Sequence, residues 1–531
     1  MREPVPTESG QVLGVPGTDR SITVFRGVPY AAAPLGPLRW RPPGPPPAWT
    51  GVRAAGTFGP MCPQPDADAR SAGVDLPMSE DCLFLNVWTR APSARERLPV
   101  LVWVHGGGFR GGTGADPRYD GERLARKGVV VVTFNYRLGA LGFLSTPGLN
   151  SESARWTAGN YGLLDCVAVL RWVRRNIAGF GGDPGRVTVA GQSAGAGTAN
   201  FLAMSPLARG LFHRAVAQSH ARCPGDPELR YLATSYRTAR DAERAGERYA
   251  AARGARSPAE LRALPWRRLV EEGTAADAVD DGVETGSTAK PPLFRPVVDG
   301  WALPAGYAHT YDGGAQNDVD YLAGGNLDES GAVPEDAIAA LRARGPASWR
   351  PGAPPVHLTR ADRLAAARRK YGPLADEFLR LYPADTDDEA AHAHNRAVRD
   401  NTRVSTHLWA RRWGAHATRP VHTYFWTHRS PAQRPPRAGH GSEIDYVFGN
   451  LDPARAPWTA QDREIAETMS SYWANFAATG DPEGPGLPSW PAYDPAAPAV
   501  MEVGARFGPA PVATPAVLDF WRRFFASQDA W

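Results

Sequence analysis

The sequence predicts an α/β fold: a large mixed, mostly parallel central sheet with helices on both faces. Two continuous apolar runs, Val100–Val104 and Val129–Phe134, are typical of strands that are covered on both sides. Apolar residues then recur at helical spacing over Leu163–Ile177, and a third apolar run follows at Val187–Ala190. This alternation of strand, loop, helix and strand favours a parallel sheet.

The composition indicates a globular protein and excludes several classes of function. The chain has 531 residues, of which 43% are hydrophobic and 21% charged, so it can bury a large core. Its net charge of +4 comes mostly from arginines spread among acids, so no basic tract favours a nucleic-acid partner. No run approaches the roughly 18 apolar residues of a membrane span. Because HExxH, P-loop and Cys/His cluster motifs are missing, we expect no metal and no cofactor.

The N-terminus and the four cysteines bear on the cellular compartment. Residues 1–10 lack the apolar segment of a signal peptide, which favours a cytoplasmic location. A disulfide between Cys62 and Cys82 would close a loop of about 20 residues and stabilise the fold by roughly 3 kcal/mol. Two free thiols in a reducing cytosol are the alternative. We expect Cys166 and Cys223 to be buried single thiols.

The N-terminal part, residues 10–60, predicts short strands at the edge of the sheet. Ile22–Phe25 is apolar, but the prolines that follow remove backbone donors that a central strand needs. Further along, two amphipathic helices are expected at Tyr231–Ala252 and Pro258–Glu272. They carry too few apolar residues for a core of their own. We therefore expect a helical insertion over the sheet edge at about 224–292.

Strand patterns return at Val319–Ala323 and Val421–Trp426, and a polar helical region at about 333–415 separates them. Thr459–Ala478 keeps its apolar residues on one face, which is typical of a long packing helix. We expect one domain over residues 1–531, to which the two helical regions are added.

The most informative stretch is Gly191-Gln-Ser-Ala-Gly195, which directly follows the third apolar run. Beyond it, Ala194–Met204 is rich in Ala and Leu and predicts a helix. A G-x-S-x-G turn between a strand and a helix exposes the serine hydroxyl, and its glycines avoid collisions with neighbouring backbone. Ser193 is therefore a candidate nucleophile. On the motif alone, an ordinary turn serine is the alternative.

A serine nucleophile needs a base, an acid that orients the base, and donors for the oxyanion. In such folds these groups follow successive strands in the order serine, acid, histidine. The strand at Val319–Ala323 runs into Gly324–Gly331, and the strand at Val421–Trp426 leads to a loop with Ala438–Glu443. We expect the acid and the base at these two strand ends, with His440 as the base. A structural histidine is the alternative there.

These motifs, with several others, resemble the type-B carboxylesterase/lipase family of α/β-hydrolases, which includes bacterial para-nitrobenzyl esterases. The resemblance covers nearly the whole chain, and it implies the α/β-hydrolase fold with helical insertions over the active site. The matching stretches are Phe25–Ala31, Glu80–Trp88, His105–Phe109, Gly159–Leu163, Tyr472–Phe476 and Thr479–Pro482.

The resemblance implies a role for each motif residue. Ser193 matches the nucleophile, His440 the general base and Glu329 the acid, with Asp328 as the competitor for the last role. The implied oxyanion donors are the backbone N–H groups of three residues: Gly107, Gly108 and Ala194. Glycine suits the first two because the backbone must approach the substrate oxygen closely. A flexible linker is the alternative for the Gly-Gly-Gly tract.

The chain departs from the family pattern at two positions. Gln192 stands where the family usually has Glu, so we expect an altered buried network with activity retained. His220 follows Gln218-Ser219 where relatives commonly have Gly, and it is either a packing variant or a second base. Cys62 and Cys82 match a disulfide of many secreted relatives. No aromatic residue lies between them, which argues against choline esters as substrates.

The resemblance implies a serine carboxylesterase that hydrolyses small to medium carboxylic esters through an acyl-enzyme on Ser193. The alternatives are the same chemistry on carbamates, amides or lactones, acyl transfer to an alcohol, or a non-catalytic binding or adhesion relative. We expect a small-molecule ester substrate and a monomer or weak dimer.

Overall fold

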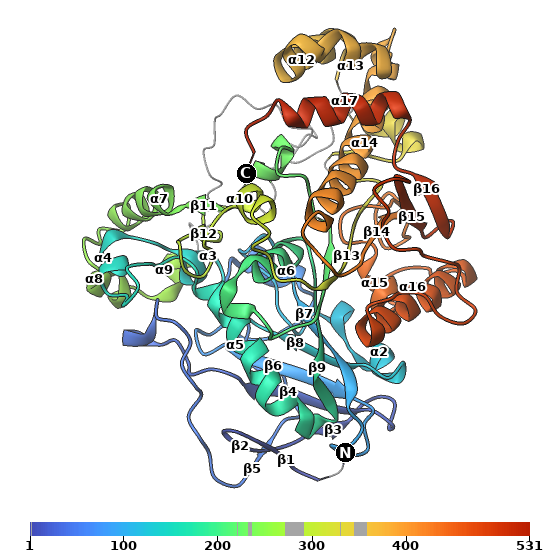
Figure 1. The fold of residues 1–531 in the computed structure, drawn as a ribbon. Helices are drawn as coiled ribbons and strands as arrows, with labels where there is room; N and C mark the ends of the chain where they lie inside the picture. Colours follow the sequence, from blue (N-terminus) through green and yellow to red (C-terminus); the bar gives the residue numbers. More distant parts are fainter. Residues whose placement is uncertain are drawn as a thin grey trace.

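The computed structural model describes residues 1, 3–219, 221–231, 236–270, 291–329, 331–344 and 358–530. Across these residues the central sheet has eleven strands in the order β16-β15-β14-β13-β10-β9-β7-β8-β6-β4-β3 (Figure 1). In chain order these strands are β3 (Val15–Pro16), β4 (Thr23–Pro29), β6 (Phe84–Thr89), β7 (Leu98–Val104), β8 (Val130–Phe134), β9 (Gly182–Gln192), β10 (Arg214–Gln218), β13 (Asp320–Asn326), β14 (Val421–Trp426), β15 (Ala499–Val503) and β16 (Gly508–Pro511).

The sheet is parallel in its centre and antiparallel at both ends. The pairs from β8 through β7, β9, β10, β13 and β14 to β15 are parallel. The pairs β15–β16, β8–β6, β6–β4 and β4–β3 are antiparallel. This confirms the predicted mixed, mostly parallel sheet. Two small sheets lie outside it: β1 (Val5–Thr7) with β2 (Gly10–Leu13) and β5 (Val52–Ala54), and β11 (Arg237–Thr238) with β12 (Val297–Val298).

Seventeen α-helices surround the strands in the described part of the chain. They are α1 (Asp66–Ser71), α2 (Glu122–Arg126), α3 (Gly139–Phe143), α4 (Pro147–Ser151), α5 (Tyr161–Asn176), α6 (Ala194–Met204), α7 (Ala239–Ala251), α8 (Pro258–Ala263), α9 (Trp266–Val270), α10 (Tyr307–Asp312), α11 (Ile338–Ala343), α12 (Arg360–Tyr371), α13 (Ala375–Leu381), α14 (Asp387–Gly414), α15 (Ile444–Phe448), α16 (Ala460–Thr479) and α17 (Pro515–Ala526).

Two apolar cores lie on opposite faces of the sheet, because successive strand residues point to opposite sides. Val100, Val102 and Val104 of β7 belong to the core that contains Trp172 of α5 and Phe201 of α6. The alternate residues of β7, Leu101 and Trp103, belong to the core built with three other helices: Leu124 of α2, Phe448 of α15 and Trp473 of α16. The continuous apolar run of β7 is therefore explained by cover on both faces.

Two expected helices differ from those observed. The helix expected at Tyr231–Ala252 begins only at Ala239, because Thr238 is its N-cap and accepts a hydrogen bond from the backbone N–H of Asp241. The helix expected at Pro258–Glu272 is divided into α8 and α9. Pro265 lies at the division, and proline disfavours helical backbone in the residue before it. Residues 271–290 lie outside the described residues.

The parallel strands bring five loops to one edge of the sheet. The segments that follow β7, β9, β10, β13 and β14 all leave from the carboxyl ends of these strands, where open α/β sheets bind ligands. None of the helices within the described ranges is long and apolar enough to cross a membrane.

Candidate active site

Ser193 occupies the sharp turn between β9 and α6. Its backbone has φ +60° and ψ −124°, a conformation that non-glycine residues rarely adopt. The turn is fixed on both sides, since the Ser193 N–H donates to the Gln218 carbonyl at 3.0 Å and the Gly197 N–H donates to the Ser193 carbonyl at 2.9 Å. The predicted strand-turn-helix context of the serine is thus present.

The two glycines of the serine motif allow α6 to pack directly on the strands. A Cβ added to Gly195 would lie 2.0 Å from the carbonyl oxygen of Val104 on β7. A Cβ added to Gly191 would lie 2.5 Å from the backbone of Gly195. Because these neighbours are backbone atoms, larger residues would push α6 away from the sheet and displace Ser193 with it.

The glycine tract after β7 lies beside the serine. A Cβ on Gly106 would be 3.1 Å from the Ser193 Cβ, and the tract turns at Gly107 (φ +111°) and Gly108 (φ +64°). Across the described residues, the N–H groups of Gly107, Gly108 and Ala194 are paired with no acceptor. Ala194 is also the first residue of α6, where the helix dipole favours negative charge. These N–H groups are therefore available to a developing oxyanion.

Glu329 and His440 meet across the ends of β13 and β14. The Glu329 Oε1 lies 3.2 Å from the His440 Nδ1. The Glu329 side chain is 3% exposed, whereas the His440 side chain is 44% exposed and so remains open to a substrate. Ser219, after β10, donates its hydroxyl hydrogen to the same Glu329 oxygen. A buried carboxylate that binds Nδ1 orients the imidazole and leaves Nε2 for a proton transfer.

Asp328 has a different set of partners. One carboxylate oxygen pairs with Arg399 of α14 at 2.8 Å, and the other accepts the Ala438 N–H at 3.1 Å. Asp328 therefore fixes the loop that carries His440, while its neighbour Glu329 points at the imidazole. The two adjacent acids therefore contact different groups: Asp328 binds Arg399 and the Ala438 N–H, and Glu329 binds the imidazole.

Desolvation and charge act in opposite directions on the pKa of His440. The protein around the ring lowers it even though part of the side chain is exposed, but the hydrogen bond and negative charge of Glu329, with the charge of Glu443, outweigh this and raise the pKa above its usual 6.5. The pKa of His105, which precedes the glycine tract, is shifted in the opposite direction. Burial lowers its pKa to about 4, so this ring is neutral at pH 7 and packs on Tyr136.

Glu443 is a second buried carboxylate, and its contribution to the site was not predicted from the sequence. It accepts hydrogen bonds from Gln218 at 3.0 Å and from Asn326 at 2.6 Å. Burial, followed by the nearby charge of Glu329, raises its pKa despite the Asn326 hydrogen bond. Asn326 also donates to the Gly439 carbonyl at 2.8 Å, so it connects the end of β13 to the His440 loop.

Gln192 is buried against the imidazole. Its side-chain Nε2 lies 3.2 Å from the Nε2 and 3.4 Å from the Nδ1 of His440. The expected change in the buried network at this position therefore bears on the histidine itself. His220, the second departure from the family pattern, lies outside the described residues.

All four cysteines are buried free thiols. This agrees with the single thiols expected at Cys166 and Cys223. Cys62 and Cys82 face each other closely enough to hydrogen-bond, and burial, followed by Cys62, raises the pKa of the Cys82 thiol. The two sulfurs thus lie side by side, and the disulfide between Cys62 and Cys82 stays a prediction.

The sheet order and the strand-to-helix serine turn define an α/β-hydrolase. The chain belongs to the carboxylesterase family, whose family model matches residues 2–514. It is 37% identical over 505 residues to the fumonisin B1 esterase of Sphingopyxis macrogoltabida, with 92% of this chain and 84% of the relative covered. It is 33% identical over 565 residues to liver carboxylesterase 1 of Oryctolagus cuniculus, with 99% and 94% covered.

Solved structures agree with these sequence comparisons. A PNB esterase structure superposes with a TM-score of 0.77 at 30% identity and covers 99% of both chains. A second PNB esterase structure gives a TM-score of 0.75 at 29% identity and covers 99% of this chain and 100% of the other. The protein is a carboxylic ester hydrolase of the α/β-hydrolase fold.

Proposed function

We propose that the protein hydrolyses small to medium carboxylic esters through an acyl-enzyme on Ser193, with His440 as general base and Glu329 as its orienting acid. The main support for this proposal is the 3.2 Å distance between the Glu329 Oε1 and the His440 Nδ1. Gln192, the residue before Ser193, lies 3.2 Å from the same imidazole. In the first step the Ser193 oxygen attacks the ester carbonyl while His440 takes the hydroxyl proton. His440 then returns that proton to the departing alcohol.

The second step reverses these roles with water in place of the alcohol. His440 takes a proton from water, the resulting oxygen attacks the acyl-enzyme carbonyl, and the carboxylic acid leaves as Ser193 regains its proton. In both steps the N–H groups of Gly107, Gly108 and Ala194 stabilise the negative oxygen. Loss of one such donor typically costs about 3–4 kcal/mol of barrier.

Hydrolysis of para-nitrophenyl esters with acyl chains from C2 to C12 tests this function. The wild type should release nitrophenol with an optimum at short to medium chains, and Ser193→Ala should lose the activity. Ser205→Ala is a matched control, because Ser205 is a buried serine at the far end of α6 and its hydroxyl donates to the Ala302 carbonyl. Full activity of Ser193→Ala would contradict the proposal, and so would an optimum at C12.

A further inference from the structure

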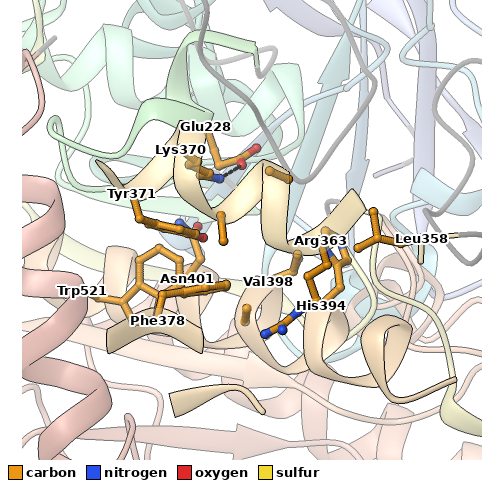
Figure 2. A pocket seen from close by; sticks show the side chains of 13 residues that line it. Glu228, Leu358, Arg363, Lys370, Tyr371, Phe378, His394, Val398, Asn401 and Trp521 are labelled. Atoms are coloured by element: carbon orange, nitrogen blue, oxygen red, sulfur yellow. Dashed lines mark hydrogen bonds and ion pairs between the residues drawn. The ribbon is translucent and has the colours of Figure 1, made fainter. Parts of the chain in front are cut away.

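A partly open cavity lies among the helices α12, α13, α14 and α17, away from α6 and the serine turn (Figures 1 and 2). Its volume is about 80 Å³. A cavity whose volume, measured in the same way, is roughly 10–15 Å³ holds one water molecule. This cavity therefore has room for a small organic molecule. Figure 2 shows the rings of Tyr371, Phe378 and Trp521 grouped at one end, with Arg363 and His394 at the other. The cavity therefore combines an aromatic wall with a polar end.

Arg363 is a buried cation without a counter-ion in this cavity. The residue is 5% exposed, and no acidic side chain among the described residues pairs with it. One terminal nitrogen donates to the Tyr382 carbonyl, while Nε has no acceptor within the described ranges. Burial and the neighbouring Arg396 lower the pKa of Arg363, which reflects the cost of this uncompensated charge.

The other charged groups of the cavity neutralise each other. The Lys370 Nζ lies 2.9 Å from the Glu228 Oε1, and both side chains are largely buried. Figure 2 draws this ion pair across one side of the cavity. The excess positive charge is therefore that of Arg363, whose guanidinium carbon lies 5.5 Å from the centre of the Phe378 ring.

We propose that this cavity binds a small carboxylate with an apolar body. The carboxylate would accept a hydrogen bond from the Arg363 Nε, since guanidinium and carboxylate groups form strong charge-assisted pairs. The body would pack on Tyr371, Phe378 and Trp521. An inorganic anion would satisfy the guanidinium but leave the aromatic wall unfilled, so the walls favour an organic acid.

One lining residue of the cavity is connected to the surroundings of His440 through Arg222. Asn401 of α14 lines the cavity and accepts a hydrogen bond from Arg222 at 2.8 Å. The charge of Arg222 in turn acts on His440. The binding proposal itself does not depend on the role given to Ser193, and its test uses binding rather than hydrolysis.

Calorimetric titration with benzoate, and with benzamide as the uncharged analogue, tests the proposal. Benzoate should bind the wild type at least ten times more tightly than benzamide. Arg363→Met should weaken benzoate binding at least tenfold. Arg368→Met, which alters an exposed arginine of the same helix, should bind like the wild type. Equal binding of benzoate and benzamide would overturn the proposal, as would unchanged binding by Arg363→Met or no binding by the wild type.

Two further measurements keep the test independent of the folding of one variant. Ala366→Leu keeps Arg363 but fills space in the cavity, and it should also weaken benzoate binding at least tenfold. In crystals of the wild type soaked with 4-bromobenzoate, the anomalous bromine peak should lie among Tyr371, Phe378 and Trp521. A peak elsewhere, with none in the cavity, would overturn the proposal.

Discussion

Glu329→Gln is the substitution that most sharply separates the roles of the two adjacent acids. It keeps the size of the side chain but removes a negative charge whose oxygen lies 3.2 Å from the His440 Nδ1. A charge pair at about 4 Å is worth about 4 kcal/mol at an effective dielectric of 20, and a loss of that size slows a reaction about 10³-fold. In other serine triads, replacing the carboxylate of the acid by an amide lowers kcat about 10⁴-fold. We therefore expect kcat to fall by about 10³–10⁴.

The matched control is Asp328→Asn. Asp328 pairs with Arg399 and accepts the Ala438 N–H, so its change should lower the free energy of unfolding by about 1–3 kcal/mol. Its effect on kcat should be small by comparison. The assay is kcat on a para-nitrophenyl ester at saturating concentration, together with urea unfolding of both variants. Comparable losses of kcat in the two variants would refute this assignment, as would more than a tenth of wild-type kcat in Glu329→Gln.

Further tests concern Gln192, Gly195 and Asp462. Gln192→Glu places a carboxylate beside His440, which should raise the histidine pKa and move the acidic limb of kcat/KM upward by about one pH unit; an unmoved or lowered limb would contradict this. Gly195→Ala would put a Cβ 2.0 Å from the Val104 carbonyl oxygen, so the esterase activity and the midpoint of thermal unfolding should both fall. The control is Gly414→Ala, which has open space around the added Cβ and should leave both unchanged or raise the midpoint. Burial raises the pKa of Asp462, but hydrogen bonds from Thr459 and Tyr446 outweigh burial and lower this pKa from 3.8 to about 2. The charged form of Asp462 should therefore stabilise the fold by about 2 kcal/mol above pH 4, and this stabilisation should be lost as the pH falls toward 2. Urea unfolding of Asp462→Asn and wild type at pH 7 and pH 3 should show a smaller difference at the lower pH.

The parts of the site that follow from local sequence were predicted well. The end of β9 and helix α6 correspond to the apolar run before Ser193 and the helix predicted after it. Each of these patterns depends only on residues that are close together in the sequence. His440 could be located because it follows a strand between two glycines. The strand predicted before it was also correct, since β14 spans Val421–Trp426 as the apolar pattern indicated.

What the sequence did not predict depends on contacts between distant segments. Ser219 donates to Glu329 across 110 positions, and Gln218 donates to Glu443 across 225. Arg363 lies in a charged helix, and its burial depends on contacts with residues outside that helix, such as the Tyr382 carbonyl and the Phe378 ring. Nor does spacing decide which of the adjacent acids Asp328 and Glu329 faces the histidine, since that depends on side-chain direction.

If Ser193 carries the acyl group, a reagent that forms a covalent bond with activated serines should label it. A phosphonofluoridate ester, which transfers its phosphonyl group to activated serines with loss of fluoride, is incubated with the wild type and with Ser193→Ala. Intact mass and peptide mapping follow. We expect one phosphonyl group per chain, on the peptide that contains Ser193, and no label on the variant. A label on another residue, or an unlabelled wild type that still hydrolyses esters, would contradict it.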